Sequence, residues 1–62
     1  MKKYELERLA DGYWVLYFWD DEFGFWEEIR KYDAKTTTIK DIYDFVKGNN
    51  RFDSQIVLKF IL

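Results

Sequence analysis

The first third of the chain has the hydrophobic pattern of two strands joined by a tight turn. Residues 3–10 alternate apolar with charged side chains, and this period of two predicts a half-buried strand. Residues 13–19 are seven consecutive apolar residues, which predict the returning strand. Asp11-Gly12 lies between them and predicts a two-residue hairpin turn, because both central positions of such a turn adopt a positive φ.

A two-residue turn fixes which residues oppose one another, and directly opposed residues share a face of the sheet. Leu6 is then expected opposite Tyr17, and Glu7 opposite Leu16. One face, which we expect the helix to cover, carries Tyr4, Leu6, Arg8, Ala10, Tyr13, Val15, Tyr17 and Trp19. The other face, which we expect to stay open, carries Lys3, Glu5, Glu7, Leu9, Trp14, Leu16, Phe18 and Asp20.

The rest of the chain predicts a third strand, one helix and a last strand. Residues 25–33 carry charges at both parities, as an exposed edge strand does. Residues 38–47 repeat apolar side chains at the helical spacing, with Thr38 as the N-cap. Gly48 follows as the residue expected to end this helix. Residues 54–62 alternate within a largely apolar segment and predict the last strand.

These elements predict a single small α+β domain over residues 1–62, with one four-stranded mixed sheet and a single helix packed on one face. The element order is β-β-β-α-β, and the last strand is expected beside the first, because the charged third strand suits an edge. The face that Trp26 and Tyr32 join stays open, since it depends on the length of the preceding loop. Four strands span ~19 Å. A helix is only ~10–12 Å across, so much of the sheet lacks cover.

Composition limits the chemistry that the chain can perform. It contains no His and no Cys, so the commonest general base and the thiol nucleophile are both absent. Carboxylates adjoin in Asp20-Asp21-Glu22 and Glu27-Glu28. A 62-residue chain, however, offers no deep cleft that would raise the pKa of a carboxyl group. The first group also lacks the alternating spacing of a calcium-binding loop. We therefore expect no enzymatic activity, no cofactor and no metal.

Charge and hydropathy bear on the cellular setting. The formal net charge of −2 gives no strong attraction to nucleic acid or to an anionic membrane. No apolar run approaches the length of a transmembrane helix, and the first ten residues lack the apolar stretch of a signal peptide. A cytoplasmic protein is the expectation.

The expected open face predicts a binding module. Acidic residues would steer a basic partner protein, and aromatic residues would anchor it. A compact chain of this kind suits an inhibitor of a basic, nucleic-acid-binding host protein, of the type that a phage or another mobile element carries. The predicted partner-binding residues are Glu5, Glu7, Trp14, Leu16, Phe18, Asp20, Asp21, Glu22, Phe23 and Trp26.

Four alternatives stand beside this hypothesis. The open face would bind single-stranded nucleic acid by stacking on Trp14 and Phe18, although the neighbouring acids would repel a phosphate backbone. It would instead complete the core in a symmetric homodimer. The loop at residues 49–53, with Phe52, would fold over it. Lastly, the chain would be a structural or designed domain without a partner.

Overall fold

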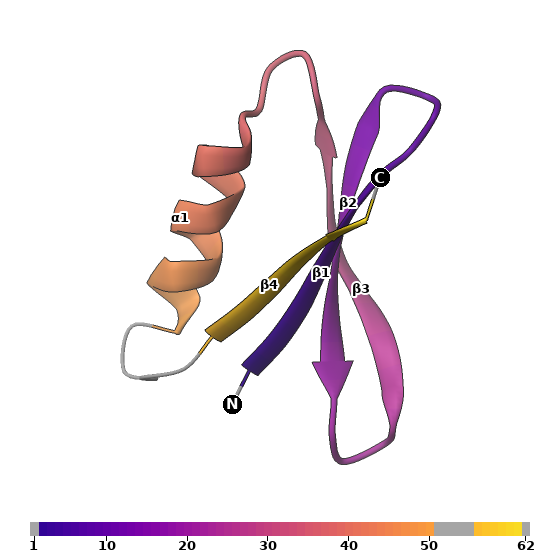
Figure 1. The fold of residues 1–62 in the computed structure, drawn as a ribbon, viewed down its shortest axis with the longest axis vertical. Coiled ribbons are helices and arrows are strands. Elements are labelled where there is room, and N and C mark those ends of the chain that lie inside the picture. The colour runs from indigo at the N-terminus through magenta and orange to yellow at the C-terminus, as the bar shows by residue number, and fades with distance from the viewer. Residues whose placement is uncertain (1, 51–55, 62) are drawn as a thin grey trace.

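The computed structural model of the protein describes residues 2–50 and 56–61. Its elements are β1 (Lys2–Arg8), β2 (Tyr13–Asp20), β3 (Phe25–Asp33), α1 (Ile39–Asn49) and β4 (Ile56–Ile61) (Figure 1). The strands form one sheet in the order β3-β2-β1-β4. β1 is antiparallel to β2 and parallel to β4, and β2 is antiparallel to β3. The predicted α+β class, the element order and the place of the last strand are confirmed.

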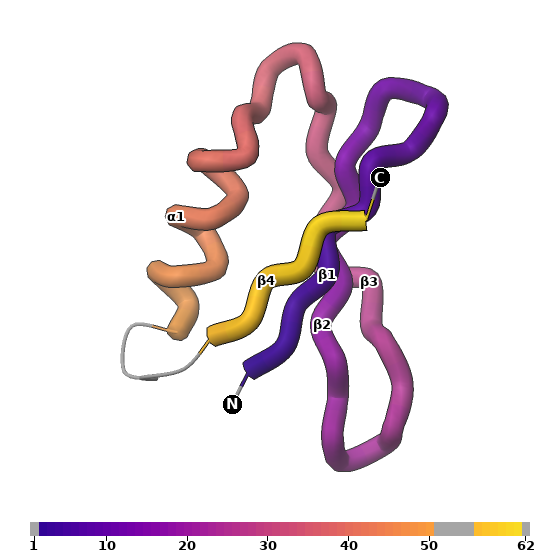
Figure 2. The backbone as a smooth tube through the Cα atoms, viewed as in Figure 1, coloured from indigo at the N-terminus to yellow at the C-terminus, as the bar shows by residue number. Residues whose placement is uncertain are grey.

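Helix α1 packs against one face of this sheet (Figure 2). Its predicted start is confirmed, because Thr38 Oγ1 accepts a hydrogen bond from the Asp41 amide at 3.2 Å, and Asp41 Oδ2 accepts one from the Thr38 amide at 3.1 Å. Its predicted end is wrong. The helix runs through Gly48, and the Asn50 amide donates to the Lys47 carbonyl at 3.1 Å to cap it. The predicted loop residues 51–53, with Phe52, and strand residues 54, 55 and 62 lie outside the described residues.

The hydrophobic core lies between α1 and the sheet. Its buried residues are Tyr4, Leu6, Trp14, Leu16, Ile42 and Val46. Partly buried residues pack around it: Phe18, Tyr32, Ala34, Phe45, Ile56 and Leu58. Fully burying one such aliphatic or aromatic side chain stabilises the fold by ~1.5–3 kcal/mol. Because the core residues that β1 and β2 contribute all have even numbers, the even-numbered side chains of these two strands face the helix.

The β1–β2 turn differs from its prediction by one residue. The Leu9 amide donates to the Tyr13 carbonyl at 2.9 Å, so residues 10–12 form a three-residue loop rather than a two-residue one. The Gly12 amide donates to the Leu9 carbonyl at 3.3 Å, and Gly12 adopts a φ of 93°. A turn followed by one residue in the left-handed region is the common three-residue hairpin connection.

This difference exchanges the two faces of the sheet, because side chains alternate along a strand. Leu6 opposes Leu16 rather than Tyr17. Trp14 and Leu16, predicted on the open face, are only 8% and 0% exposed beneath α1, and Phe18 is half-buried on the same side. The open docking face predicted around these three residues is thus corrected: the residues belong to the core side of the sheet.

The face that actually lacks the helix is shielded in part by its own side chains. Its residues on β1, β2 and β4 are Lys3, Glu5, Glu7, Tyr13, Val15, Tyr17, Trp19, Val57, Lys59 and Ile61. Val15, at the centre of β2, is only 2% exposed. Beside it the Lys31 ammonium lies 4.7 Å from the centre of the Tyr13 ring. This face therefore is not one continuous apolar patch.

A β-bulge divides strand β3. Leu16 pairs with Arg30 and Tyr17 pairs with Glu28, so Ile29 is an extra residue in the strand. The bulge puts Tyr32 opposite Trp14 on the helix face and Trp26 opposite Trp19 on the other, which resolves the facing left open by the sequence. Bulges also increase local twist. Between the bulge and its turn, the β2–β3 hairpin extends past the end of α1 (Figure 1).

Candidate protein-interaction site

The end of the β2–β3 hairpin, residues 17–28, carries a concentration of exposed aromatic side chains, and we refer to it as the hairpin tip. Phe23 is 70% exposed, the largest fraction among the large apolar side chains of the described residues. Phe25 is 48% exposed and Trp26 is 39% exposed. Among the described residues, these three side chains therefore form an exposed apolar group at the end of the hairpin.

The hairpin tip is also the most acidic part of the chain. Its acids are Asp20, Asp21, Glu22, Glu27 and Glu28, and it contains no Lys or Arg. The segment therefore has a formal charge of −5, whereas the whole chain has −2 and the remaining residues together have +3. A charge distribution of this kind produces a directional field, which attracts a basic surface to the tip.

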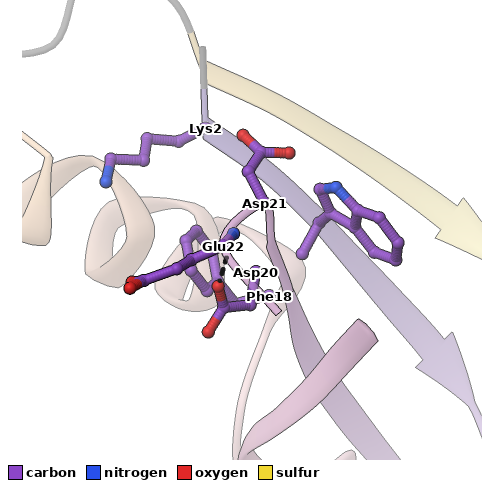
Figure 3. Close-up of a pocket in the computed structure, with 6 residues that line it drawn as sticks. Lys2, Phe18, Asp20, Asp21 and Glu22 are labelled. Atoms are coloured by element: carbon purple, nitrogen blue, oxygen red, sulfur yellow. Dashed lines mark hydrogen bonds between the residues drawn. The ribbon is translucent and has the colours of Figure 1, made fainter. Parts of the chain in front are cut away.

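The turn of the hairpin is held in a defined conformation by Asp20. Its Oδ1 accepts a hydrogen bond from the Glu22 amide at 2.9 Å (Figure 3). It accepts a second from the Phe23 amide at 3.2 Å. The Asp20 carbonyl accepts a third from the Gly24 amide at 2.8 Å, and Gly24 adopts a φ of 72°. Aspartate commonly organises turns through such bonds to the amides that follow it. The result is that Phe23 is presented at the end of an ordered turn.

Two aromatic pairs stiffen the tip. Trp19 opposes Trp26 across the strands, with ring centroids 5.2 Å apart and planes inclined by 58°. The Phe23 and Phe25 rings are 6.2 Å apart at 42°. Tilted aromatic pairs at these distances contribute ~0.5–1.5 kcal/mol beyond the area that they bury. The exposed aromatic surface is thus partly ordered before any partner arrives.

A hollow of about 470 Å³ adjoins the tip (Figure 3). It is lined by Lys2, Phe18, Trp19, Asp20, Asp21 and Glu22. The Lys2 ammonium lies 5.5 Å from the centre of the Phe18 ring. Carboxylates beside aromatic rings provide the environment that a Lys or Arg side chain favours. The Lys2 side chain of the protein itself already lies in this environment.

The structure brings together six of the ten predicted partner-binding residues. Asp20, Asp21, Glu22, Phe23 and Trp26 come together at the hairpin tip, and Phe18 borders the hollow beside it. The prediction missed Phe25 and Lys2. The signal for Phe25 was its place next to the turn, in a strand whose charges mark it as an edge. The signal for Lys2 was the β1–β2 hairpin, because antiparallel pairing in either register places the start of β1 beside the end of β2.

The other predicted residues lie elsewhere. Glu5 and Glu7 are on the face without the helix, and the Tyr17 hydroxyl donates to Glu7 Oε1 at 3.3 Å. Burial, and then the nearby Glu7 charge, raises the pKa of Tyr17 above its ordinary value of 10.0, so this phenol stays protonated as a donor. Trp14 and Leu16 are buried in the core and present no surface to a partner.

Within residues 2–50 and 56–61, no three acidic side chains are grouped as ligands for a metal ion. The helix in that part of the chain is too short to cross a bilayer. Comparison of the chain with protein-family models, with curated proteins and with solved structures gives no match.

Proposed function

We propose that the protein is a non-enzymatic binding module whose hairpin tip docks on a basic surface of another protein. The observation that supports this most directly is the combination of exposed Phe23, Phe25 and Trp26 with a local charge of −5. Aromatic side chains dominate the buried centres of protein interfaces. Acidic groups around them accelerate encounter with a basic partner and penalise acidic ones.

The order of the tip favours tight binding. Three hydrogen bonds to Asp20 hold the turn, and the Trp19–Trp26 pair holds the strands that lead to it. A binding loop that is already in its bound conformation loses less conformational entropy on association. The tip is therefore a preorganised binding loop and not a flexible segment.

An inhibitor of a basic, nucleic-acid-binding protein is the form of this function that fits best. A groove built to bind phosphates presents Lys and Arg side chains, and these bind carboxylates with similar strength. The five acids of the tip would occupy such a groove, and Phe23 would contact its floor. This form of the proposal includes the expected origin, an inhibitor carried by a phage or another mobile element and acting on a protein of the host cytoplasm.

Binding of single-stranded nucleic acid is the weaker alternative. Tyr17, Trp19 and Trp26 do lie on the face without the helix and offer rings on which bases would stack. The carboxylates of the tip, however, would repel the phosphates that follow each base. A fluorescence titration with oligo-dT at low salt is expected to leave the tryptophan emission unchanged.

Site-specific photo-crosslinking in a cell lysate tests the proposal. Benzoylphenylalanine is placed at position 23, and in a matched control at position 43, since Tyr43 is also exposed (44%) but lies on α1. We expect the probe at the tip to capture proteins rich in Lys and Arg, and unlabelled protein to compete. The same products from both positions would contradict a specific docking site.

A charge variant tests the role of the acids. Asp21→Asn, Glu22→Gln, Glu27→Gln and Glu28→Gln together remove four charges and leave the turn-forming Asp20 in place. Capture at low salt should fall by about tenfold or more, because complementary charges accelerate association. The control variant Glu5→Gln/Glu7→Gln, away from the tip, should retain capture. Undiminished capture by the fourfold variant would contradict the proposal.

A further inference from the structure

The two edges of the sheet differ in their protection against pairing with another strand. β3 has five charged residues among nine and contains the bulge at Ile29. β4 has one charged residue, Lys59, among six, and its pairing with β1 continues without a register shift. Charges and bulges are the usual devices that prevent an edge strand from pairing. Within residues 2–50 and 56–61, no strand lies on the outer side of β4.

β4 also exposes apolar side chains on both faces of the sheet. Val57 is 44% exposed and shares the face without the helix with Lys3, its neighbour on β1. Phe60 is 45% exposed on the opposite face, beside Leu6, where α1 does not reach it. A further strand along the outer edge of β4 would cover both side chains and pair the free backbone groups between them.

We propose that this strand is β4 of a second copy of the chain, paired antiparallel across a twofold axis perpendicular to the sheet. Such an axis keeps both helices on the same side of the sheet, so each residue of β4 opposes a residue that lies on the same face. The axis then passes between one residue of β4 and the same residue of the second copy. An axis at Lys59 would set two ammonium groups opposite each other, which is unfavourable. An axis at Val57 would pair only residues 56–58 of the described strand.

An axis at Leu58 avoids both problems. Leu58 opposes Leu58 of the second copy, and five residues of each strand, 56–60, are paired. On the helix face Ile56 opposes Phe60 of the second copy and covers it. On the other face Val57 opposes Lys59 of the second copy, and the stem of that lysine extends over the exposed valine.

The arrangement is compatible with the acidity of the hairpin tips. The dimer is a continuous sheet of eight strands, with the two copies of β3 at its outer edges. Antiparallel pairing directs the two tips, each with a charge of −5, to opposite ends of the sheet, so they do not meet across the seam. Both tips remain exposed, although the dimer does not depend on the function proposed for them.

The strength of the dimer follows from the size of the seam. Pairing of two short strands buries less than the ~1,200 Å² of a standard interface, so a weak association is expected. We expect a dissociation constant of ~10 μM to 1 mM, the range of weak complexes. Sedimentation velocity across this range of concentrations should therefore show a reversible shift from monomer to dimer.

Two substitutions at Val57 test both the dimer and its register. Val57→Glu places a carboxylate opposite Lys59 of the second copy, whereas Val57→Lys places a second ammonium group there. Each pair occurs twice in a twofold dimer. The dissociation constant should fall about three- to tenfold for Val57→Glu and rise by a similar factor for Val57→Lys. The control Ile29→Lys changes an equally exposed residue (42%) on the β3 edge and should leave it unchanged.

Several results would overturn the proposal. A monomer at every concentration up to ~1 mM, the upper end of the expected range of dissociation constants, would do so and would leave the docking function of the tip intact. Equal effects of Val57→Glu and Val57→Lys, or an effect of Ile29→Lys as large as theirs, would also do so. If Val57→Lys does not fold, amide exchange of the unmodified protein decides, since protection of residues 57–60 must increase with protein concentration.

Discussion

At the scale of single residues, Asn50 links the end of α1 to the sheet. It is the one buried polar side chain among the described residues, at 7% exposed. Its Nδ2 donates to Tyr4 Oη at 2.7 Å and to the Val46 carbonyl at 2.8 Å. One side chain thus satisfies a carbonyl near the end of the helix and a hydroxyl on β1. Nothing in the hydrophobic pattern indicated this role, because the residue lies outside both periodic segments.

Asn50→Ala is expected to lower the free energy of unfolding by ~1–3 kcal/mol, because the buried Tyr4 hydroxyl and Val46 carbonyl lose their partner. Urea unfolding followed by circular dichroism measures this change. The neighbouring Asn49 is exposed, so Asn49→Ala should change the free energy by less than ~0.5 kcal/mol. Equal losses from the two variants would show that the hydrogen bonds of Asn50 are not the cause.

At the scale of elements, the backbone conformations of the glycines separate two roles. Gly48 lies inside α1 without a positive φ, whereas Gly12 has a φ of 93° in the β1–β2 loop. A Cβ at either position would meet no atom within 4 Å. The two sites therefore differ in backbone conformation and not in available space.

We expect Gly48→Ala to raise the free energy of unfolding by ~0.5–1 kcal/mol, because alanine loses less backbone entropy in a helix. Gly12→Ala should lower it by ~1–2 kcal/mol, because a Cβ is strained in the left-handed region. Urea unfolding of both variants gives the comparison. A loss of stability in Gly48→Ala would mean that the helix ends before this residue in solution, as the sequence had suggested.

The elements themselves were predictable from the sequence, but the hydrophobic pattern alone did not determine which face of the sheet the helix covers. Charge alternation in β1, the capping threonine of α1 and the charged edge strand all led to the correct element order. The unbroken apolar run of residues 13–19 gave no preference for either face of β2. Asp-Gly suits a two-residue turn and also the end of a three-residue loop. One additional residue in that loop therefore determined which aromatic side chains of β2 are buried in the core.

The chemical types in β2 held a signal that would have selected the observed register. Trp14, Leu16 and Phe18 have only one polar atom among their side chains, whereas Tyr13 and Tyr17 each carry a hydroxyl. Buried hydroxyls need a hydrogen-bond partner, so the tyrosine parity is the better one to leave near solvent. The hairpin tip was predictable for a different reason: its residues lie beyond the helix whichever face is covered.

At the scale of the whole molecule, protonation of a carboxylate in acid and deprotonation of a phenol in alkali lower the stability of the fold. The Thr38 amide and then the Thr38 hydroxyl lower the pKa of Asp41 below its ordinary value of 3.8. Burial raises the pKa of Tyr32 above 10.0, although the charge of Arg30 opposes the shift. The Tyr32 hydroxyl is also buried without a hydrogen-bond partner among the described residues.

The sign of each shift determines where stability is lost. A lowered pKa stabilises the native state above the unfolded value, so the contribution of Asp41 disappears as the pH falls below about 4. A raised pKa has the opposite consequence, and stability declines as the pH rises above about 10. We expect urea midpoints to fall at both extremes, Asp41→Asn to flatten the acid side, and Tyr32→Phe the alkaline side. Unchanged slopes in these variants would assign the losses to other groups.

The parallel pairing of β1 with β4 has a consequence for synthesis on the ribosome. Lys2 pairs with Ile56 and Glu7 with Ile61, so one side of β1 has no partner until residues 56–61 have left the exit tunnel. Until then β1 is an unpaired edge of the sheet β3-β2-β1, and the core lacks Ile56 and Leu58, which pack against it in the complete fold. Such a nascent chain is a substrate for chaperones until translation supplies the last strand.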